Sequence, residues 1–262
     1  MKLANKIIIA AAIVLMVVGV LIMVGTAATK QFSFNLNDFN NTEYEDKDFK
    51  FTETINNIEI DSSVSEVEFF VKEGDSLQVS IRESSRIKYD VSVKGDTLSI
   101  KSEKERGFNF FGFGTETHIY IYLPKNTLDS ITIDSSTGAV TIPELYCNNI
   151  EIDISTGATT LKGTVIKNEL KIDSSTGGIG LIDVTAGNMN LDVSTGAIEF
   201  DNCEAYEIIA HASTGSISGT LKGDYAYDAS SSTGSVSVPS SSGSRRCKLS
   251  ASTGSIDIKK AK

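Results

Sequence analysis

The chain has 262 residues, with 24 lysines and arginines against 34 aspartates and glutamates, which gives a formal net charge of −10. An acidic surface repels nucleic acid, and the sequence holds no basic groove interleaved with aromatic residues, so nucleic-acid binding is excluded. The three cysteines, Cys147, Cys203 and Cys247, have no metal-type spacing and form no disulfide framework; they are expected to be small buried hydrophobic side chains.

An apolar stretch near the amino terminus has the length of a membrane span. Residues 7–25 are all apolar or small, which is enough for one transmembrane helix. Two lysines precede the stretch, so residues 1–6 are expected in the cytoplasm and everything after residue 25 outside the membrane. A cleaved signal peptide is the alternative, because residues 26–28 are small, but its apolar region is usually about 7 to 15 residues long. We therefore predict a retained, single-pass signal anchor.

Two segments separate the anchor from the repeats. Residues 26–50 are rich in Asn, Asp, Glu and Phe and are predicted to form an acidic stalk between the membrane and the fold. Residues 51–128 are predicted to form a degenerate first repeat and a β-meander that caps the stack. The meander segments alternate apolar and polar residues, and Glu73-Gly74-Asp75 and Lys94-Gly95-Asp96 mark hairpin turns. The expected strands are residues 67–72, 77–81, 89–93, 98–101 and 119–123.

The tripeptide Ser-Thr-Gly recurs throughout residues 129–262, at intervals of 19 or 20 residues. A fixed short period is typical of units that bury their apolar faces only by stacking on one another. The fold is therefore predicted to be all-β after the anchor, a β-solenoid of the β-helix or β-roll kind with about seven to eight coils. The glycines of the tripeptides are Gly138, Gly157, Gly177, Gly196, Gly215, Gly234 and Gly254.

The apolar residues around each of these glycines change their parity. Ile131 and Ile133 occupy alternate places before Gly138, whereas Val140 and Ile142 follow it one place out of step. A strand that changes its buried face must bulge or turn a corner, and glycine does so at no steric cost. Ser-Thr-Gly is therefore predicted to mark the corner of each coil, with Ile133 and Val140 facing one shared interior.

The two ends of the stack are expected to be atypical. Upstream, residues 58–65 align with residues 131–138, but Val64 and Ser65 replace the corner Thr-Gly. Terminal repeats differ from the others because they cover an open end of the core. At the carboxyl end, residues 259–262 include three lysines, which are expected at an edge, where lysines discourage the stacking of another molecule.

Aspartates recur four residues before each corner, at positions whose side chains are expected to face outward from the sheet. In neighbouring coils about 4.8 Å apart they would form a column of like charges, which is unfavourable without compensation. One hypothesis is that each Asp accepts hydrogen bonds from backbone or serine groups at its corner. Another is a row of divalent cations, although one carboxylate per coil falls short of the six to eight oxygens that calcium takes. The members are Asp61, Asp134, Asp153, Asp173 and Asp192, with His211, Ser230 and Ser250 at the equivalent places of later coils.

One segment between two meander strands breaks the alternation. Residues 106–114 contain three glycines, which permit a mobile loop, and four phenylalanines: Phe108, Phe110, Phe111 and Phe113. An exposed apolar loop marks a contact with a membrane or a protein, so these phenylalanines are candidate partner-binding residues. The alternative is that they fold over the open end of the solenoid core.

No set of catalytic residues emerges from the sequence. The two histidines, His118 and His211, are interpreted as surface or packing residues. Sugar-cleaving β-helix enzymes are the enzymes closest to this architecture, and they need a carboxylate cluster in a cleft. The aspartates come from regular repeat positions, whereas active sites usually break the repeat. We therefore predict a protein that is not an enzyme and has no cofactor.

The chain resembles a family of bacterial "putative adhesins" of unknown function that have β-strand repeats. The resemblance covers about residues 50–258. It rests on the unit Ile-x-Ile-Asp-x-Ser-Thr-Gly-x-Ile-x-Leu, on Tyr122-Leu123-Pro124-Lys125 before the first full copy, and on the prelude of residues 58–69. The resemblance implies a β-solenoid at the cell envelope, often on an amino-terminal anchor, with some relatives linked to envelope stress signalling alongside membrane regulators. It supplies no catalytic residues.

These observations predict a membrane-tethered, extracytoplasmic bacterial surface protein that presents a binding surface in adhesion or envelope-stress sensing. The expected ligand is a cell-wall polymer, a lipid or a regulatory membrane protein. Two alternatives stay open. One is a structural protein that assembles end to end into filaments, because uncovered solenoid ends pair their edges. The other is a polysaccharide-active enzyme that uses Asp153 and Asp173.

Overall fold

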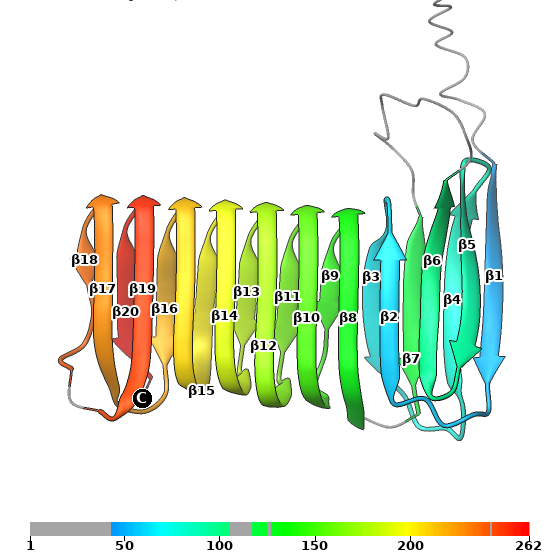
Figure 1. The fold of residues 1–262 in the computed structure, drawn as a ribbon, viewed down its shortest axis with the longest axis horizontal. Coiled ribbons are helices and arrows are strands. Elements are labelled where there is room, and N and C mark those ends of the chain that lie inside the picture. The colour runs from blue at the N-terminus through cyan, green and yellow to red at the C-terminus, as the bar shows by residue number, and fades with distance from the viewer. Residues whose placement is uncertain (1–42, 105–116, 125–126, 242, 262) are drawn as a thin grey trace, which may run out of the picture. The chain divides into compact units, whose positions relative to one another are not determined.

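The computed structural model describes residues 43–104, 117–124, 127–241 and 243–261, and all regular structure in these residues is β-strand (Figure 1). The all-β prediction is confirmed for this part of the chain. None of the described residues forms an apolar helix long enough to cross a membrane. The predicted anchor, residues 7–25, lies outside them.

Each coil contributes one strand to each of two sheets, so the solenoid has two walls. The long-strand sheet contains, in spatial order, β5 (Ile87–Lys94), β6 (Thr97–Lys104), β2 (Asn57–Ser62), β8 (Thr127–Thr137), β10 (Tyr146–Thr156), β12 (Val165–Thr176), β14 (Thr185–Thr195), β15 (Ile198–Thr214), β19 (Arg245–Thr253) and β17 (Tyr225–Thr233). The short-strand sheet contains β1 (Tyr44–Phe51), β4 (Leu77–Ser84), β7 (His118–Leu123), β3 (Glu66–Val71), β9 (Val140–Ile142), β11 (Thr159–Lys162), β13 (Ile179–Ile182), the first part of β15, β16 (Ile217–Leu221), β20 (Ile256–Lys260) and β18 (Val236–Ser237).

The core lies between the two sheets and is continuous from coil to coil. Ile133 in β8 and Val140 in β9 are both 0% exposed, so the backbone changes its buried face between them, as predicted. The parallel register passes over Ser136 and Ser155, one residue on each strand, at the place where the parity changes. A corner at every Ser-Thr-Gly therefore lets successive coils share one apolar interior.

The corner glycines stand in a column in which each one touches the next. A Cβ built on Gly177 would lie 1.7 Å from the carbonyl oxygen of Gly157, and one on Gly157 would lie 1.8 Å from that of Gly138. The glycines also adopt φ between 137° and 149°, a region that L side chains rarely adopt. The first coil has Ser65 at this place, and its carbonyl oxygen lies against Gly138 in the same way. Glycine is thus required by contact between coils as well as by the turn.

The segment predicted as a meander extends both sheets beyond the first coil. Lys94-Gly95-Asp96 turns a hairpin between β5 and β6, as predicted, but the hairpin predicted at Glu73-Gly74-Asp75 is wrong, because β3 pairs with β7 and β9 and β4 pairs with β7 and β1. In the long-strand sheet, β2 pairs in parallel with both β8 and β6, and the antiparallel β5 forms the edge. In the short-strand sheet, β3 is followed by β7, β4 and β1, and β1 is the edge. The register that opposes Ile58 to Ile131 and Asp61 to Asp134 places residues 58–62 as a further copy of the repeat.

The end of the predicted stalk is wrong, because residues 44–50 belong to β1. This strand pairs with β4 along its whole length and packs Phe49 and Phe51 against the core. The outward positions of this strand carry charged side chains, both acids and a lysine. These charges obscured the strand pattern in the sequence. A strand with such charges is suited to an edge because they discourage further pairing.

The last two coils do not stack in chain order. The coil of β19 and β20 lies between the coil of β15 and β16 and that of β17 and β18 (Figure 1). Tyr225, at the start of β17, is fully buried and reaches across the inserted strand, where its hydroxyl bonds the backbone N–H and carbonyl of Ala205 at 3.1 Å each. The expectation that residues 259–262 protect the end is therefore wrong for the outermost coil, which is residues 225–241.

A glycine-to-alanine substitution in the column tests the contact between coils. Gly177→Ala places a methyl group against the Gly157 carbonyl and should lower the free energy of unfolding by about 3 kcal/mol or more. Gly180→Ala is the matched control, because the nearest atom to a Cβ there is 3.9 Å away, and it should change stability by less than about 1 kcal/mol. Urea-induced unfolding of the full chain in mild detergent measures both. Equal midpoints for the two variants would contradict a backbone contact at Gly177.

A buried carboxylate ties the edge strands together and gives a second prediction. Glu83 in β4 is 1% exposed, and its Oε2 lies 2.7 Å from Lys47 Nζ in β1 and 3.2 Å from Lys88 Nζ in β5. Burial raises the pKa of Glu83, but hydrogen bonds from Lys47, the Tyr89 N–H and Lys88 outweigh it and hold the pKa below its usual value.

Glu83→Gln should therefore destabilise the fold by about 2 kcal/mol at neutral pH. This is less than the usual cost of breaking a buried ion pair, because both lysines are partly exposed. A lowered folded pKa means that the contribution is complete above the ordinary Glu pKa and is lost as the pH falls through the folded pKa. Thermal unfolding of both proteins between neutral and acidic pH checks this. A difference that grows on acidification would refute the assignment.

Candidate functional site

The outward aspartates form a continuous acidic column on the long-strand sheet. The pairing opposes Asp61 to Asp134, then Asp134 to Asp153, Asp153 to Asp173, and Asp173 to Asp192. His211 of β15 faces Asp192 on the neighbouring strand, followed by Ser250 and Ser230 in the inserted and outermost coils. The sequence thus predicted the members of this column and their alignment correctly.

The first hypothesis, that corner groups donate hydrogen bonds to these aspartates, fails in the described residues. Within the described part of the chain, no corner hydroxyl or backbone N–H donates to Asp134, Asp153 or Asp192, so the hydrogen-bond hypothesis is wrong. Lys171, which protrudes from β12 next to the column, lies 3.4 Å from Asp173 and 2.8 Å from Glu151. This cation offsets the repulsion at one place and leaves the rest of the column acidic.

The electrostatic effect of the column is seen at its centre. Burial raises the pKa of Asp153, and the charges of Asp134 and Asp173 on the two neighbouring strands raise it further. A row of bound cations would relieve this repulsion, but the described residues hold no group of three or more His, Cys, Asp or Glu side chains placed around one ion. In the described residues the column is thus a stripe of single carboxylates, one from each coil.

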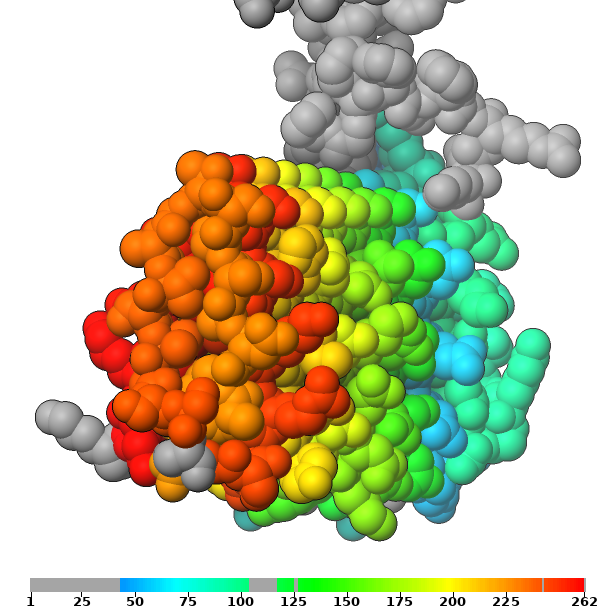
Figure 2. Space-filling model, turned by 60° about the vertical axis from the view of Figure 1, so that its left-hand side comes forward, coloured from blue at the N-terminus to red at the C-terminus, as the bar shows by residue number. Residues whose placement is uncertain are grey.

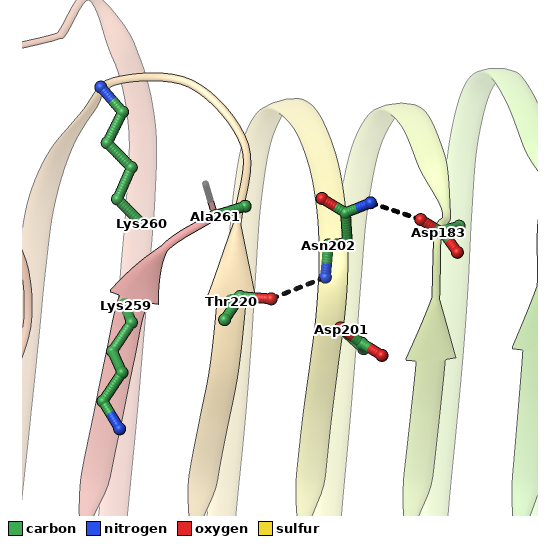
Figure 3. Close-up of a pocket in the computed structure, with 7 residues that line it drawn as sticks. All are labelled: Asp183, Asp201, Asn202, Thr220, Lys259, Lys260 and Ala261. Carbon is green, nitrogen blue, oxygen red and sulfur yellow. Dashed lines mark hydrogen bonds between the residues drawn. The ribbon is translucent and has the colours of Figure 1, made fainter.

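The second corner of the coils carries a shallow groove that the sequence analysis missed (Figure 3). Its volume is about 440 Å³. Asn202 donates from its side chain to Asp183 and from its backbone N–H to Thr220 Oγ1 at 2.8 Å. Asp183 and Asn202 have φ of 52° and 60°, and the register places Gly163 (φ 68°) at the same corner. The succession Gly, Asp, Asn at one place of the period is the signal that could have revealed this left-handed corner.

Most of the charges around the groove are paired with one another. Lys260 Nζ lies 2.6 Å from Asp224, Lys259 Nζ lies 3.4 Å from Asp257, and Lys222 Nζ lies 3.9 Å from Asp183. Lysines and acids thus lie side by side along this corner. The groove has the character of a salt-bridged surface more than of a small-molecule site.

The remaining residues singled out in the sequence are dispersed. His118 in β7 stacks on Tyr120 at 4.1 Å between ring centroids, and burial lowers its pKa. His211 bonds Ser250 Oγ through Nδ1 at 2.8 Å. The two histidines lie on different sheets and form no common site. Phe108, Phe110, Phe111 and Phe113 lie outside the described residues.

The cysteines are buried, as predicted, and burial raises the pKa of Cys147 to about 11, of Cys203 to about 11 and of Cys247 to about 12. Their thiols are therefore protonated at neutral pH and poorly reactive. They pack as small hydrophobic side chains in the core of the solenoid.

An aromatic cluster on the outward face of the meander was also missed. Phe70 in β3 stacks on Tyr122 in β7 with centroids 5.1 Å apart and meets Tyr120 edge-on at 5.7 Å. Lys72 Nζ lies 3.7 Å from the centroid of the Tyr122 ring. These ring and ammonium contacts join the neighbouring strands β3 and β7 on their outer face.

The structure defines a two-walled β-solenoid with a meander cap and an acidic stripe on its long-strand sheet. The sequence profile of the Toastrack DUF4097 family matches residues 55–262, and the chain belongs to this family, which confirms the resemblance drawn from the repeat unit. No curated protein matches the chain in sequence.

Solved structures from several bacteria are similar to the chain. A protein of Bacteroides fragilis called a "putative adhesin" is 19% identical, with a TM-score of 0.48 over 83% of this chain and 97% of its own. A "putative lipid binding protein" of Parabacteroides distasonis is 15% identical, with a TM-score of 0.47 over 84% and 98%. A "putative cell adhesion protein" of Clostridium sporogenes is 12% identical, with a TM-score of 0.41 over 84% and 100%.

Substitution at the centre of the acidic column tests the repulsion. Asp153→Asn should raise the free energy of unfolding by about 0.5 kcal/mol at neutral pH and low salt, and salt should diminish the gain. A carboxylate whose folded pKa is raised destabilises the fold above that pKa, so the gain should vanish on acidification as Asp153 becomes protonated. Urea unfolding at two salt concentrations and across this pH range measures it. A loss of stability at neutral pH would show that Asp153 is held by favourable partners.

Proposed function

We propose that this protein is a non-enzymatic binding module of the bacterial cell envelope. Residues 7–25 anchor it in the membrane in a single pass, residues 1–6 remain in the cytoplasm, and the solenoid stands outside. It acts in adhesion or envelope-stress sensing by presenting a rigid surface to a wall polymer, a lipid or a regulatory membrane protein. Membership of the Toastrack DUF4097 family and the apolar length of residues 7–25 support this proposal.

The observation that carries the proposal is the uncompensated acidic column. Its four central members, Asp134, Asp153, Asp173 and Asp192, repel one another across paired strands, and among the described residues only Asp173 has a lysine or arginine nitrogen within 4 Å. A repeat fold can place neutral residues at this position, as it does at Ser230 and Ser250. Retaining the carboxylates at a cost in stability favours a role in contacting a partner that presents positive charge.

The geometry gives less support to the two alternatives. Asp153 and Asp173 are direct neighbours on the outer face of a sheet, whereas a polysaccharide-cleaving pair flanks a bond held in a cleft. Filaments need two open ends, but the meander end closes with β1, whose eight residues include five charges. A surface that binds without transforming its ligand fits the described residues best.

A pull-down from solubilised cell membranes and wall fractions tests the proposal. The bait is the full chain, and the stripe variant carries Asp134→Ser, Asp153→Ser, Asp173→Ser and Asp192→Ser. We expect the wild type to retain a partner that the stripe variant loses by about tenfold or more, because long-range attraction to a positive surface falls with the charge removed. A second variant with all four phenylalanines of residues 108–113 changed to serine asks whether that segment contributes.

The matched control removes the same number of carboxylates from the other parts of the surface through Glu68→Ser, Glu144→Ser, Glu199→Ser and Asp201→Ser. It should retain the partner. Equal loss in the control would show that binding depends on the net charge of the protein and not on the acidic column. Retention by every variant, or shortening of a wall polysaccharide during incubation, would refute the proposed function.

A further inference from the structure

The carboxyl-side end of the solenoid is formed by the coil of β17 and β18, which is the sixth repeat in the sequence. The seventh repeat, β19 and β20, lies one coil further in. Figure 2 turns this end toward the viewer, and the orange atoms of the sixth repeat cover it while the red atoms of the seventh lie behind them. In the described chain, β17 and β18 have no strand on their outer side.

This end lacks the charges that protect the other one. Residues 225–241 contain a single charged side chain, Asp228, and are otherwise mainly serine, alanine, tyrosine and valine. At the opposite end, β1 alone carries Glu45, Asp46, Lys47, Asp48 and Lys50. Charges on an edge strand are a common means of preventing further pairing. Their absence from one end only makes that end competent for edge pairing.

The apolar side chains of the outermost coil are also only partly covered. Val236 is 42% exposed, whereas Ile256, its partner in the inserted coil, is 0% exposed. Tyr227 and Ala229 are half-buried, opposite the buried Cys247 and Leu249. Apolar side chains therefore reach solvent between two strand edges that have no strand on their outer side in the described chain. The edge of β17 is covered at one point, where the Tyr227 N–H donates to Ser241 Oγ at 2.9 Å. Covering them removes apolar surface from water and pairs the edges in one step.

The shape of this end restricts what can cover it. It presents two strand edges, one from each sheet, with apolar side chains between them, so a single extended peptide can pair with only one edge. A coil with the same two-walled cross-section covers both edges and the core together, as β19 and β20 do inside this chain. A second copy of this chain offers such a coil with the same nearly neutral composition.

We infer that two copies of this chain dock head to head through their β17–β18 coils. A twofold axis perpendicular to the sheets sets β17 antiparallel to β17 and β18 antiparallel to β18 of the partner. The interface is isologous and closes as a dimer, because the charged meander ends remain outside. Two solenoids joined in this way carry two acidic columns and two amino-terminal anchors on one assembly, with the uncharged serine positions of the last coils between the columns. This inference does not depend on the partner proposed above.

Lysines placed on the edge test the docking. Ser230→Lys combined with Ser237→Lys places one charge on an exposed position of each strand of the outermost coil, which should raise the dissociation constant of the dimer about tenfold or more. The control is Thr132→Lys, at an exposed place in the interior strand β8. The mass of the full chain in detergent, measured by light scattering with the detergent contribution subtracted, is followed against protein concentration. Circular dichroism verifies that each variant keeps its β-structure.

The expected result is a dimer for the wild type and for Thr132→Lys, and a monomer for the edge variant at the same concentration. A monomeric wild type at every concentration would overturn the inference. So would a dimer that survives the edge lysines, because it would be held elsewhere, for example through the anchors.

Cross-linking in intact membranes identifies the occupant directly. Ser230→Cys in the full chain, treated with a short bismaleimide, should yield a covalent homodimer, whereas Thr132→Cys should not. The three natural thiols are buried and remain protonated, so they stay silent in this experiment. Cross-linking of Ser230→Cys to another protein, or to nothing, would show that a second copy does not cover this end.

Discussion

The contact on which this structure depends is that between a glycine Cα and the carbonyl oxygen of the glycine one coil away. It repeats from Ser65 and Gly138 through Gly157, Gly177 and Gly196 and leaves no space for a side chain. The same residues turn the backbone from one sheet to the other, and their N–H groups bond the threonine carbonyls of the adjacent coil, as Gly177 does with Thr195 at 2.9 Å. One glycine in each coil thus makes the close contact, the turn and the hydrogen bond. These three requirements explain why the sequence repeats with such a strict period.

Stacking in strict register explains the exposed features as well as the core. A position that repeats in sequence becomes a column in space, so an outward Asp in each repeat necessarily meets its own copies. The same register that buries Ile133, Ile152 and Ile172 in one apolar row creates the acidic column on the other face. The function that we propose uses this second consequence, and the end-to-end docking uses the fact that a stack of coils must stop somewhere.

Periodicity predicted what is local and repeated: the coil, its corner, the shared face of Ile133 and Val140, and the aligned aspartates. It failed where long-range order decides. The chain order of repeats does not reveal that β19 inserts before β17. The acidic composition of residues 44–50 concealed an edge strand, because charge is common to stalks and edges. The backbone N–H groups of the corner glycines do not reach the aspartates because they donate to the threonine carbonyls of the adjacent coil.

Residue-resolved hydrogen exchange at the corner glycines tests the central claim most directly. If every Ser-Thr-Gly corner is locked between neighbouring coils, the amides of Gly157, Gly177 and Gly196 should exchange as slowly as those of the buried strands beside them, because each donates to a threonine carbonyl of the adjacent coil. Rapid exchange at these amides, at rates typical of exposed turns, would show that the corners are free loops and that the coils are not held together there.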